Sequence, residues 1–168
     1  MKNTLLLIVS TLLIITACNN NEQASPSSDI SAIMKQDSFE KRNKEIALGC
    51  IHAGERGDIE YIISHNAKET VDYYEDRPPM RGTDSIRIAL RQMIGMWKEF
   101  KSSNELAVAD SNYVFVYNIE DVSLKTDSTG KTYHSVGVHI FKFNEEGKII
   151  EHAHVGEELK SKDFINMQ

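Results

Sequence analysis

The chain has 168 residues, of which 40% are hydrophobic and 26% charged, and its formal net charge at pH 7 is −6. This length allows one domain with a single core. No basic run interrupts the excess of acidic residues, so nucleic acid is not expected as a partner.

The first 17 residues are typical of a bacterial lipoprotein signal peptide. Lys2 is followed by an apolar run, Leu5–Ile15, that is too short for a stable transmembrane helix. The segment Ile15-Thr16-Ala17-Cys18 resembles a lipobox, so we predict lipidation of Cys18 and a location in the cell envelope. Asn19 is not the Asp of the common inner-membrane retention signal, which favours the outer membrane. In the alternative, an ordinary secretory signal peptide, Cys18 has no role.

Residues 18–37 are rich in Asn, Ser, Gln and Glu and predict a flexible tether from a lipid anchor. A single folded domain is then expected over residues 38–168. Cys50 is the only other cysteine. With Cys18 lipidated it has no intramolecular disulfide partner, and its apolar neighbours predict a buried, inert thiol.

Three helices are predicted at the start of this domain. The first begins near Phe39 and ends at Gly54–Gly57, and Asp58 caps a second, shorter one. Thr83 or Asp84 caps the third. Its apolar stripe consists of Ile86, Leu90, Met93 and Trp97.

The remainder of the domain reads as strands. A short strand, Glu69–Tyr74, is broken by Arg77-Pro78-Pro79. Four longer strands follow, at Asn104–Ala109, Tyr113–Val122, Tyr133–Phe143 and Lys148–Val155. This order predicts an α+β fold, in which three N-terminal helices pack on a curved antiparallel sheet.

The last two strands form a hairpin with a turn at Asn144–Gly147. We predict that His139 lies opposite His152, Phe141 opposite Ile150 and Gly137 opposite His154. Because strand side chains alternate between faces, His139, His152 and His154 would then share one face of the sheet.

Several short motifs in this order resemble a known superfamily. They are Ala53-Gly54-Glu55, Ala67 before a strand, Met80-Arg81-Gly82 and Gly147-Lys148-Ile149. Together, over about Arg42 to Gly156, they resemble the SnoaL-like and ketosteroid-isomerase superfamily, which has the nuclear transport factor two fold. The resemblance implies a cone-shaped α+β barrel with a deep, mostly apolar pocket, and often a homodimer formed through the outer sheet face.

The resemblance also implies candidate site residues. Asp72 matches the strand carboxylate that serves isomerases as general base. The two oxyanion-binding positions of those isomerases fall at Ala47 and His139, which argues against steroid isomerisation. Two aspartates of SnoaL-type hairpins are replaced by His139 and His154. The acid–base candidates are therefore Asp72, His139, His152 and His154, and the expected ligand-binding residues are Tyr74, Met80, Trp97, Tyr117 and Phe141.

Three interpretations of the histidines remain open. His139, His152 and His154 could bind zinc, with Asp72 or water as a fourth ligand; no other cofactor is expected. They could instead act in metal-free acid–base catalysis with Asp72. They could also be structural, bonded to Tyr117 or to one another.

Three functions follow. The first is an isomerase, cyclase or dehydratase acting on a small, mostly apolar molecule. The second is a module that binds such a ligand without chemistry. The third is an interaction module that uses the outer sheet face.

Overall fold

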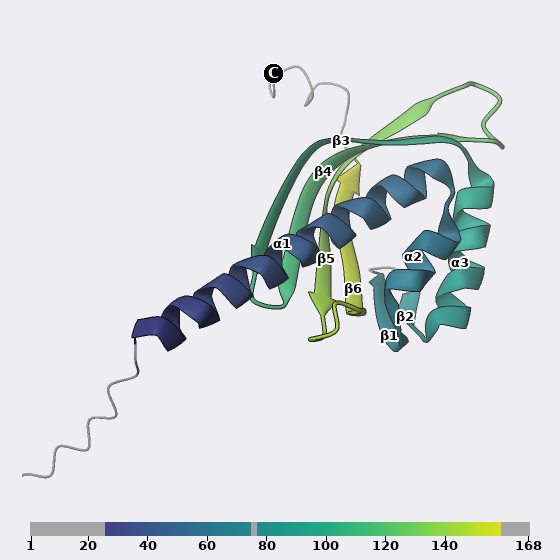
Figure 1. Cartoon of the computed structure of the whole chain (residues 1–168). Helices are drawn as coiled ribbons and strands as arrows, with labels where there is room; N and C mark the ends of the chain where they lie inside the picture. The colour runs from purple at the N-terminus through teal and green to yellow at the C-terminus, as the bar shows by residue number, and fades with distance from the viewer. Residues whose placement is uncertain (1–25, 75–76, 159–168) are drawn as a thin grey trace, which may run out of the picture.

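The computed structural model describes residues 26–74 and 77–158, which form three helices and one curved sheet of six strands (Figure 1). In chain order the elements are α1 (Pro26–Arg56), α2 (Ile59–His65), β1 (Asn66–Tyr74), β2 (Arg77–Arg81), α3 (Thr83–Met96), β3 (Trp97–Asp110), β4 (Tyr113–Leu124), β5 (Thr132–Phe143) and β6 (Ile149–Glu158). The strand order is β2-β1-β6-β5-β4-β3. The predicted α+β class, with three helices on a curved sheet, is confirmed.

The sheet differs from the prediction in one respect. It is mixed, because β1 pairs in parallel with β6 while the other neighbouring strands are antiparallel. The sheet is open, with β2 and β3 at its edges. The segment Arg77–Arg81, expected only to break a strand, forms the edge strand β2. An edge strand tolerates one of its two adjacent prolines on the side that needs no ladder hydrogen bonds, and the other falls where the register with β1 is irregular.

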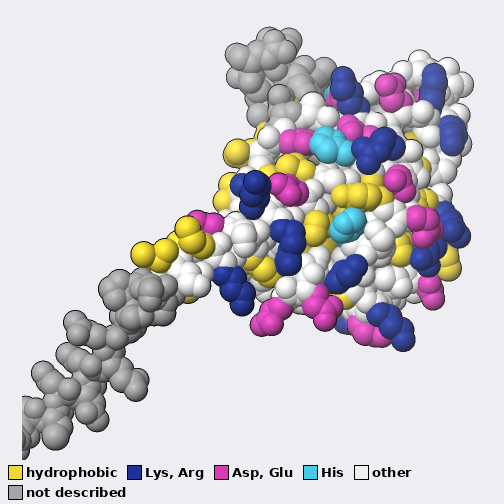
Figure 2. Space-filling model, in the orientation of Figure 1, with side chains coloured by type: hydrophobic (Ala, Val, Ile, Leu, Met, Phe, Trp, Pro, Cys, Tyr) yellow, Lys and Arg dark blue, Asp and Glu magenta, His cyan; other side chains and the backbone are white. Residues whose placement is uncertain are grey.

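Helix α1 begins at Pro26, well before the start expected near Phe39. Its first turns extend beyond the sheet (Figure 1), and Ile30, Ile33 and Met34 are 57%, 60% and 68% exposed. Figure 2 shows hydrophobic side chains where α1 leaves the body of the protein. The coil expected for residues 26–37 is therefore wrong. The polar composition does not indicate this helix, whose residues 30–38 are exposed, and its role as a tether stays a prediction.

The signal peptide, Cys18 and the end of the chain lie outside the described residues. Among the helices that the structure describes, none is long and apolar enough to cross a membrane.

The core lies between α1 and the concave face of the sheet. Buried residues of α1 pack against β4, β5 and β6 in one cluster: Ala47, Cys50, Ile51, Val114, Val116, Phe141, Phe143 and Ile149. A second cluster joins α2 to α3 through Ile63, Ile86 and Leu90. Cys50 is buried, as predicted, and burial raises the pKa of its thiol to about 12.

The helix ends confirm some predictions and correct others. Asp58 caps α2, and its Oδ1 accepts a hydrogen bond from the Tyr61 N–H at 3.1 Å. The cap of α3 is Gly82 rather than Thr83 or Asp84. Gly82 has φ +81°, a backbone conformation that glycine adopts without strain. Helix α3 ends at Met96, so Trp97 begins β3 instead of completing the helical stripe.

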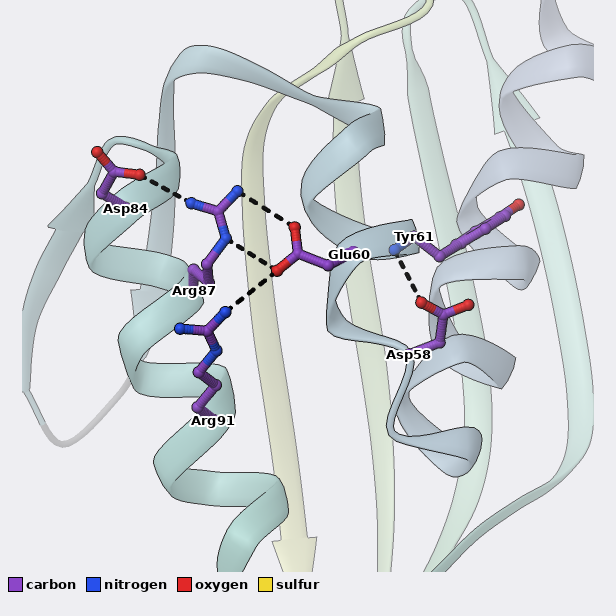
Figure 3. A network of polar contacts seen from close by, with 6 residues as sticks. All are labelled: Asp58, Glu60, Tyr61, Asp84, Arg87 and Arg91. Carbon is purple, nitrogen blue, oxygen red and sulfur yellow. Dashed lines mark hydrogen bonds and ion pairs between the residues drawn. The ribbon is translucent and has the colours of Figure 1, made fainter.

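Figure 3 shows the polar contacts that hold α2 beside α3. Glu60 of α2 accepts hydrogen bonds from Arg87 and Arg91 of α3 at 3.1 and 3.3 Å. Arg87 also donates to Asp84 at 2.8 Å. These charges lie largely at the surface, where ion pairs contribute little to stability, so their main effect is to align the two helices.

The register of the β5–β6 hairpin differs from the prediction by two residues. Phe143 pairs with Ile149, and an irregularity follows, after which Phe141 pairs with His152, His139 with His154 and Gly137 with Gly156. The extra residue of this bulge could not be read from the alternation of side chains. Because the shift is even, the histidines keep the face that was predicted for them.

Two observed strands are also longer than the predicted ones. β3 begins at Trp97 instead of Asn104, and β6 continues to Glu158 instead of ending at Val155.

Candidate functional site

A cavity of about 160 Å³ opens between the helices and the concave face of the sheet. One part of its wall is apolar and comes mainly from the helices and the start of β3: Ile51, Ile62, Ile86, Leu90, Met93, Trp97 and Phe100. The other part is polar and comes from the strands: Asp72, Tyr74, Glu120, His139, His152 and His154. The cavity therefore suits a molecule that is apolar over most of its surface and polar at one end.

The four acid–base candidates all line this cavity, together with Tyr74, Trp97 and Phe141. Tyr117 does not. It alternates with the buried residues Val116 and Asn118 on β4, so it lies on the convex face, in a shallow depression beside Val138. Met80 is also absent from the cavity wall and packs against the cluster that joins α2 to α3. The ligand-binding roles expected for Met80 and Tyr117 are therefore not supported by their positions.

A chain of hydrogen bonds connects the polar groups across four strands. The Tyr74 hydroxyl donates to Asp72 Oδ2 at 3.0 Å, and Asp72 Oδ1 lies 2.7 Å from His152 Nδ1. His152 Nε2 lies 3.2 Å from His139 Nδ1, and His139 Nε2 lies 2.9 Å from Glu120 Oε1. The sequence places these groups together because β1 is parallel to β6, which sets Asp72 beside His152.

Glu120 is a site residue that the sequence prediction missed. It lies on β4 and is 8% exposed. The available signal was its position along the strand. Residues two apart share a face, so Glu120 shares a face with Asn118, Val116 and Val114. The two valines are apolar, which indicates that this face points inward. A charged residue near a strand end is usually exposed, so the sequence alone does not indicate that Glu120 points inward.

Asn118 supports Glu120 from within the sheet. It is fully buried, and its Nδ2 donates to Glu120 Oε1 at 3.2 Å and to Ser102 Oγ at 3.0 Å. Ser102 Oγ in turn donates to Glu105 Oε1 at 2.7 Å. The carboxylate of Glu120 is thus held on two sides, by Asn118 and by His139.

Burial and hydrogen bonding act in opposite directions at the Glu120–His139 contact. Burial is the main cause that lowers the pKa of His139 to about 4; the neighbouring imidazoles act in the same direction, and the hydrogen bond with Glu120 opposes them. Burial alone would raise the pKa of Glu120, but the hydrogen bond and attraction from His139 outweigh it, and the pKa is lowered. At neutral pH, Glu120 is therefore ionised and His139 neutral.

The three contacts that join Asp72, His152, His139 and Glu120 each need one hydrogen. A neutral imidazole offers one N–H and a carboxylate offers none. With two neutral imidazoles and two carboxylates, one of the three contacts would have no hydrogen.

His154 lies beside this chain. It pairs with His139 across the hairpin, and its ring centroid is 4.4 Å from that of His139. Its Nε2 lies 3.6 Å from Glu120 Oε2. Among the described residues, the set whose ligand atoms lie within 4.8 Å of one another is Glu120, His139 and His154. This set differs from the predicted His139, His152 and His154: Glu120 takes the place of His152, whose two nitrogens contact Asp72 and His139.

An open, curved α+β sheet whose helices enclose an apolar cavity defines a class of small-molecule pocket proteins. Residues 49–152 match the SnoaL-like domain, and the chain belongs to that family. No protein of curated function matches the sequence significantly.

Two solved structures support the same fold. A proposed polyketide cyclase from Xanthomonas campestris pv. campestris is 16% identical, with a TM-score of 0.64 over 76% of this chain and 96% of the other. An epoxide hydrolase of M. tuberculosis described as LEH-like is 14% identical, with a TM-score of 0.60 over 70% of this chain and 84% of the other. At these identities the likeness concerns the fold alone.

Proposed function

We propose that this protein is an enzyme that carries out acid–base chemistry on a small, mostly apolar molecule. The observation that carries the proposal is the hydrogen-bonded chain from Asp72 to Glu120 at the polar end of an apolar cavity. Isomerase, cyclase and dehydratase reactions all need a group that takes a proton from the substrate and returns it elsewhere. The names of the two structural relatives favour the same range of chemistry.

Asp72 is the proton acceptor in this proposal. It is buried, lines the cavity and is 2.7 Å from His152 Nδ1. His152 Nδ1 holds the carboxylate in place and can exchange a proton with it. The second nitrogen of His152 connects this pair to His139. Tyr74 donates to the other oxygen of Asp72. A side chain that only packed the core would not need these two polar partners.

The size of the cavity restricts the substrate. A cavity of about 150 Å³ lined by apolar side chains holds benzene, and the present one measures about 160 Å³. We therefore expect a molecule of one ring, whose hydrocarbon part contacts Leu90, Met93 and Trp97 and whose oxygen meets the polar end.

The test is turnover of a panel of one-ring ketones, hydroxyketones and epoxides. Asp72→Asn and His152→Gln keep the size of each side chain but remove its ability to take up a proton. Each should lower kcat by about 10²–10⁴-fold. His134→Ala, on β5 but outside the cavity wall, is the control and should leave kcat unchanged. Turnover that survives both cavity substitutions would refute the assignment.

A non-catalytic ligand carrier is the second candidate, and the predominance of apolar residues in the cavity wall favours it. In this case the one-ring compounds should quench the fluorescence of Trp97, the only tryptophan, and be recovered unchanged. Binding should then survive Asp72→Asn and weaken in Leu90→Ala.

The localisation that we propose is the cell envelope, with a lipid on Cys18 and the outer membrane as the favoured site. The lipobox-like segment of the sequence supports it. Radiolabelled palmitate supplied to expressing cells should label the wild-type chain and not Cys18→Ala; label on both would exclude the anchor.

We also propose that two copies associate through the convex face. Four of its side chains are 37–62% exposed although apolar: Leu106, Val108, Tyr113 and Phe115. Such a continuous apolar surface is typical of an interface.

A further inference from the structure

At the polar end of the cavity two buried carboxylates contact imidazoles: Asp72 contacts His152, and Glu120 contacts His139 and His154. Asp72 is 4% and Glu120 8% exposed. Among the described residues that line the cavity there is no lysine or arginine. Buried charges are normally paired or bind a metal, because an unpaired charge in a low-dielectric site is costly. The local charge is therefore balanced only if the imidazoles carry protons or a cation binds.

The donor atoms of Glu120, His139 and His154 have the spacing of a metal site. The ligand atoms lie within 4.8 Å of one another. His139 Nε2 is 2.9 Å from Glu120 Oε1, and His154 Nε2 is 3.6 Å from Glu120 Oε2. Ligands about 2.0–2.2 Å from a tetrahedral zinc lie roughly 3.3–3.5 Å apart, a value between these two distances.

His154 supplies an independent observation. Its Nε2 is buried and has no hydrogen-bond partner among the described residues. Two opposed glycines, Gly137 and Gly156, make room for this ring: a Cβ at Gly137 would collide with His154 Nε2, and one at Gly156 would lie 3.0 Å from His154 Cε1. The sheet thus holds an imidazole nitrogen 3.6 Å from Glu120 Oε2, without a hydrogen bond to any described residue.

The surrounding hydrogen bonds also fit a metal ligand. A metal-binding histidine usually donates its other N–H to a second group, which fixes the tautomer. If His139 Nε2 binds a cation, its Nδ1–H donates to His152 Nε2, and His152 Nδ1–H donates to Asp72. In this arrangement the cation joins His139 to Glu120, and the two imidazole N–H groups make the other two contacts.

We propose that Glu120, His139 and His154 bind one divalent transition-metal ion, for which zinc is the probe of choice. Two imidazoles and one carboxylate are a usual ligand set for such ions and leave a coordination position open toward the cavity. There a bound ion would act as a Lewis acid or activate water. The inference does not depend on the proposed activity, because binding is measured without turnover.

The test is equilibrium dialysis of the full chain in detergent, produced without a polyhistidine tag, against buffered Zn²⁺, followed by elemental analysis. About one zinc per chain is expected for the wild type and for the control His134→Ala. Glu120→Gln and His154→Gln should lose it. Asp72→Asn, which acts only through His152, should weaken binding by about 10–100-fold.

Three results would overturn the proposal. The first is a folded wild type that retains no zinc. The second is binding that persists in both Glu120→Gln and His154→Gln. The third is binding lost in His152→Gln but not in His154→Gln, which would place the ion on another set of histidines. Circular dichroism of each variant separates lost binding from lost folding. If either ligand variant unfolds, the decision rests on the other, and on whether Zn²⁺ raises the Tm of the wild type but not of that variant.

Discussion

Asn118 shows how strongly a single buried amide can constrain the site. Its Nδ2 donates to both Glu120 and Ser102, and its own Oδ1 has no partner among the described residues. The residue therefore holds the carboxylate at the cost of one unsatisfied oxygen. An unsatisfied buried oxygen does not stabilise the fold, so this arrangement is better explained by the positioning of Glu120.

Replacement of this residue gives a prediction at the same scale. Asn118→Ala removes the buried amide that donates to both Glu120 and Ser102, so the free energy of unfolding should fall by about 1–3 kcal/mol. Urea denaturation measures it. Lys98→Ala, at an exposed position, should change the value by less than about 0.5 kcal/mol. Equal effects of the two substitutions would mean that Asn118 does not hold the carboxylate.

Cys50 provides a second prediction for a single residue. Its thiol is 5% exposed, and burial raises its pKa to about 12. Because the thiolate is the reactive form, the native protein should react with iodoacetamide far more slowly than the protein in urea. Equal rates in the two states, measured by mass spectrometry, would show that the thiol is accessible.

At the scale of elements, the β5–β6 hairpin positions the histidines through its glycines. A methyl group at Gly137 would meet the ring of His154, whereas one at Gly95 in α3 would meet nothing within 4 Å. Gly137→Ala should therefore destabilise the protein by about 1–3 kcal/mol, through overpacking. Gly95→Ala should stabilise it by about 0.4–1 kcal/mol, because alanine has less conformational entropy than glycine in the unfolded chain. Thermal unfolding compares them, and a stabilising Gly137→Ala would contradict the contact.

The elements also show what the sequence could and could not predict. Side-chain alternation located β4, β5 and β6 and the shared face of the histidines, because a face depends only on parity. The pairing partners depend on a bulge at the turn, which alternation does not record. Glu120 was missed because its inward position follows from the burial of Val114 and Val116 rather than from its own character.

For the whole molecule, the convex face is the surface through which we propose that two copies associate. The strand register aligns Val108, Phe115, Ile140 and Ala153 in one row across four strands. Side chains on this face cannot reach the cavity, since neighbouring residues of a strand point to opposite faces. Assembly and ligand binding should therefore respond to different substitutions.

Phe115→Lys places a charge in the middle of this row and should convert a dimer into a monomer, measured by sedimentation equilibrium in detergent. Ile88→Lys is the matched control, because Ile88 is an equally apolar residue, 58% exposed, on α3 away from the convex face. A wild type that is monomeric at micromolar concentration, or a dimer that resists Phe115→Lys, would exclude this interface.

The central claim is that Asp72 accepts a proton from a one-ring molecule in the cavity. Deuterium exchange into the α-position of cyclohexanone in D₂O, followed by NMR, tests it most directly. The wild type should accelerate the exchange in proportion to its concentration, and Asp72→Asn should reduce the enzyme-dependent rate by about 10²–10⁴-fold. Exchange that is no faster with the wild type than with Asp72→Asn would contradict the claim.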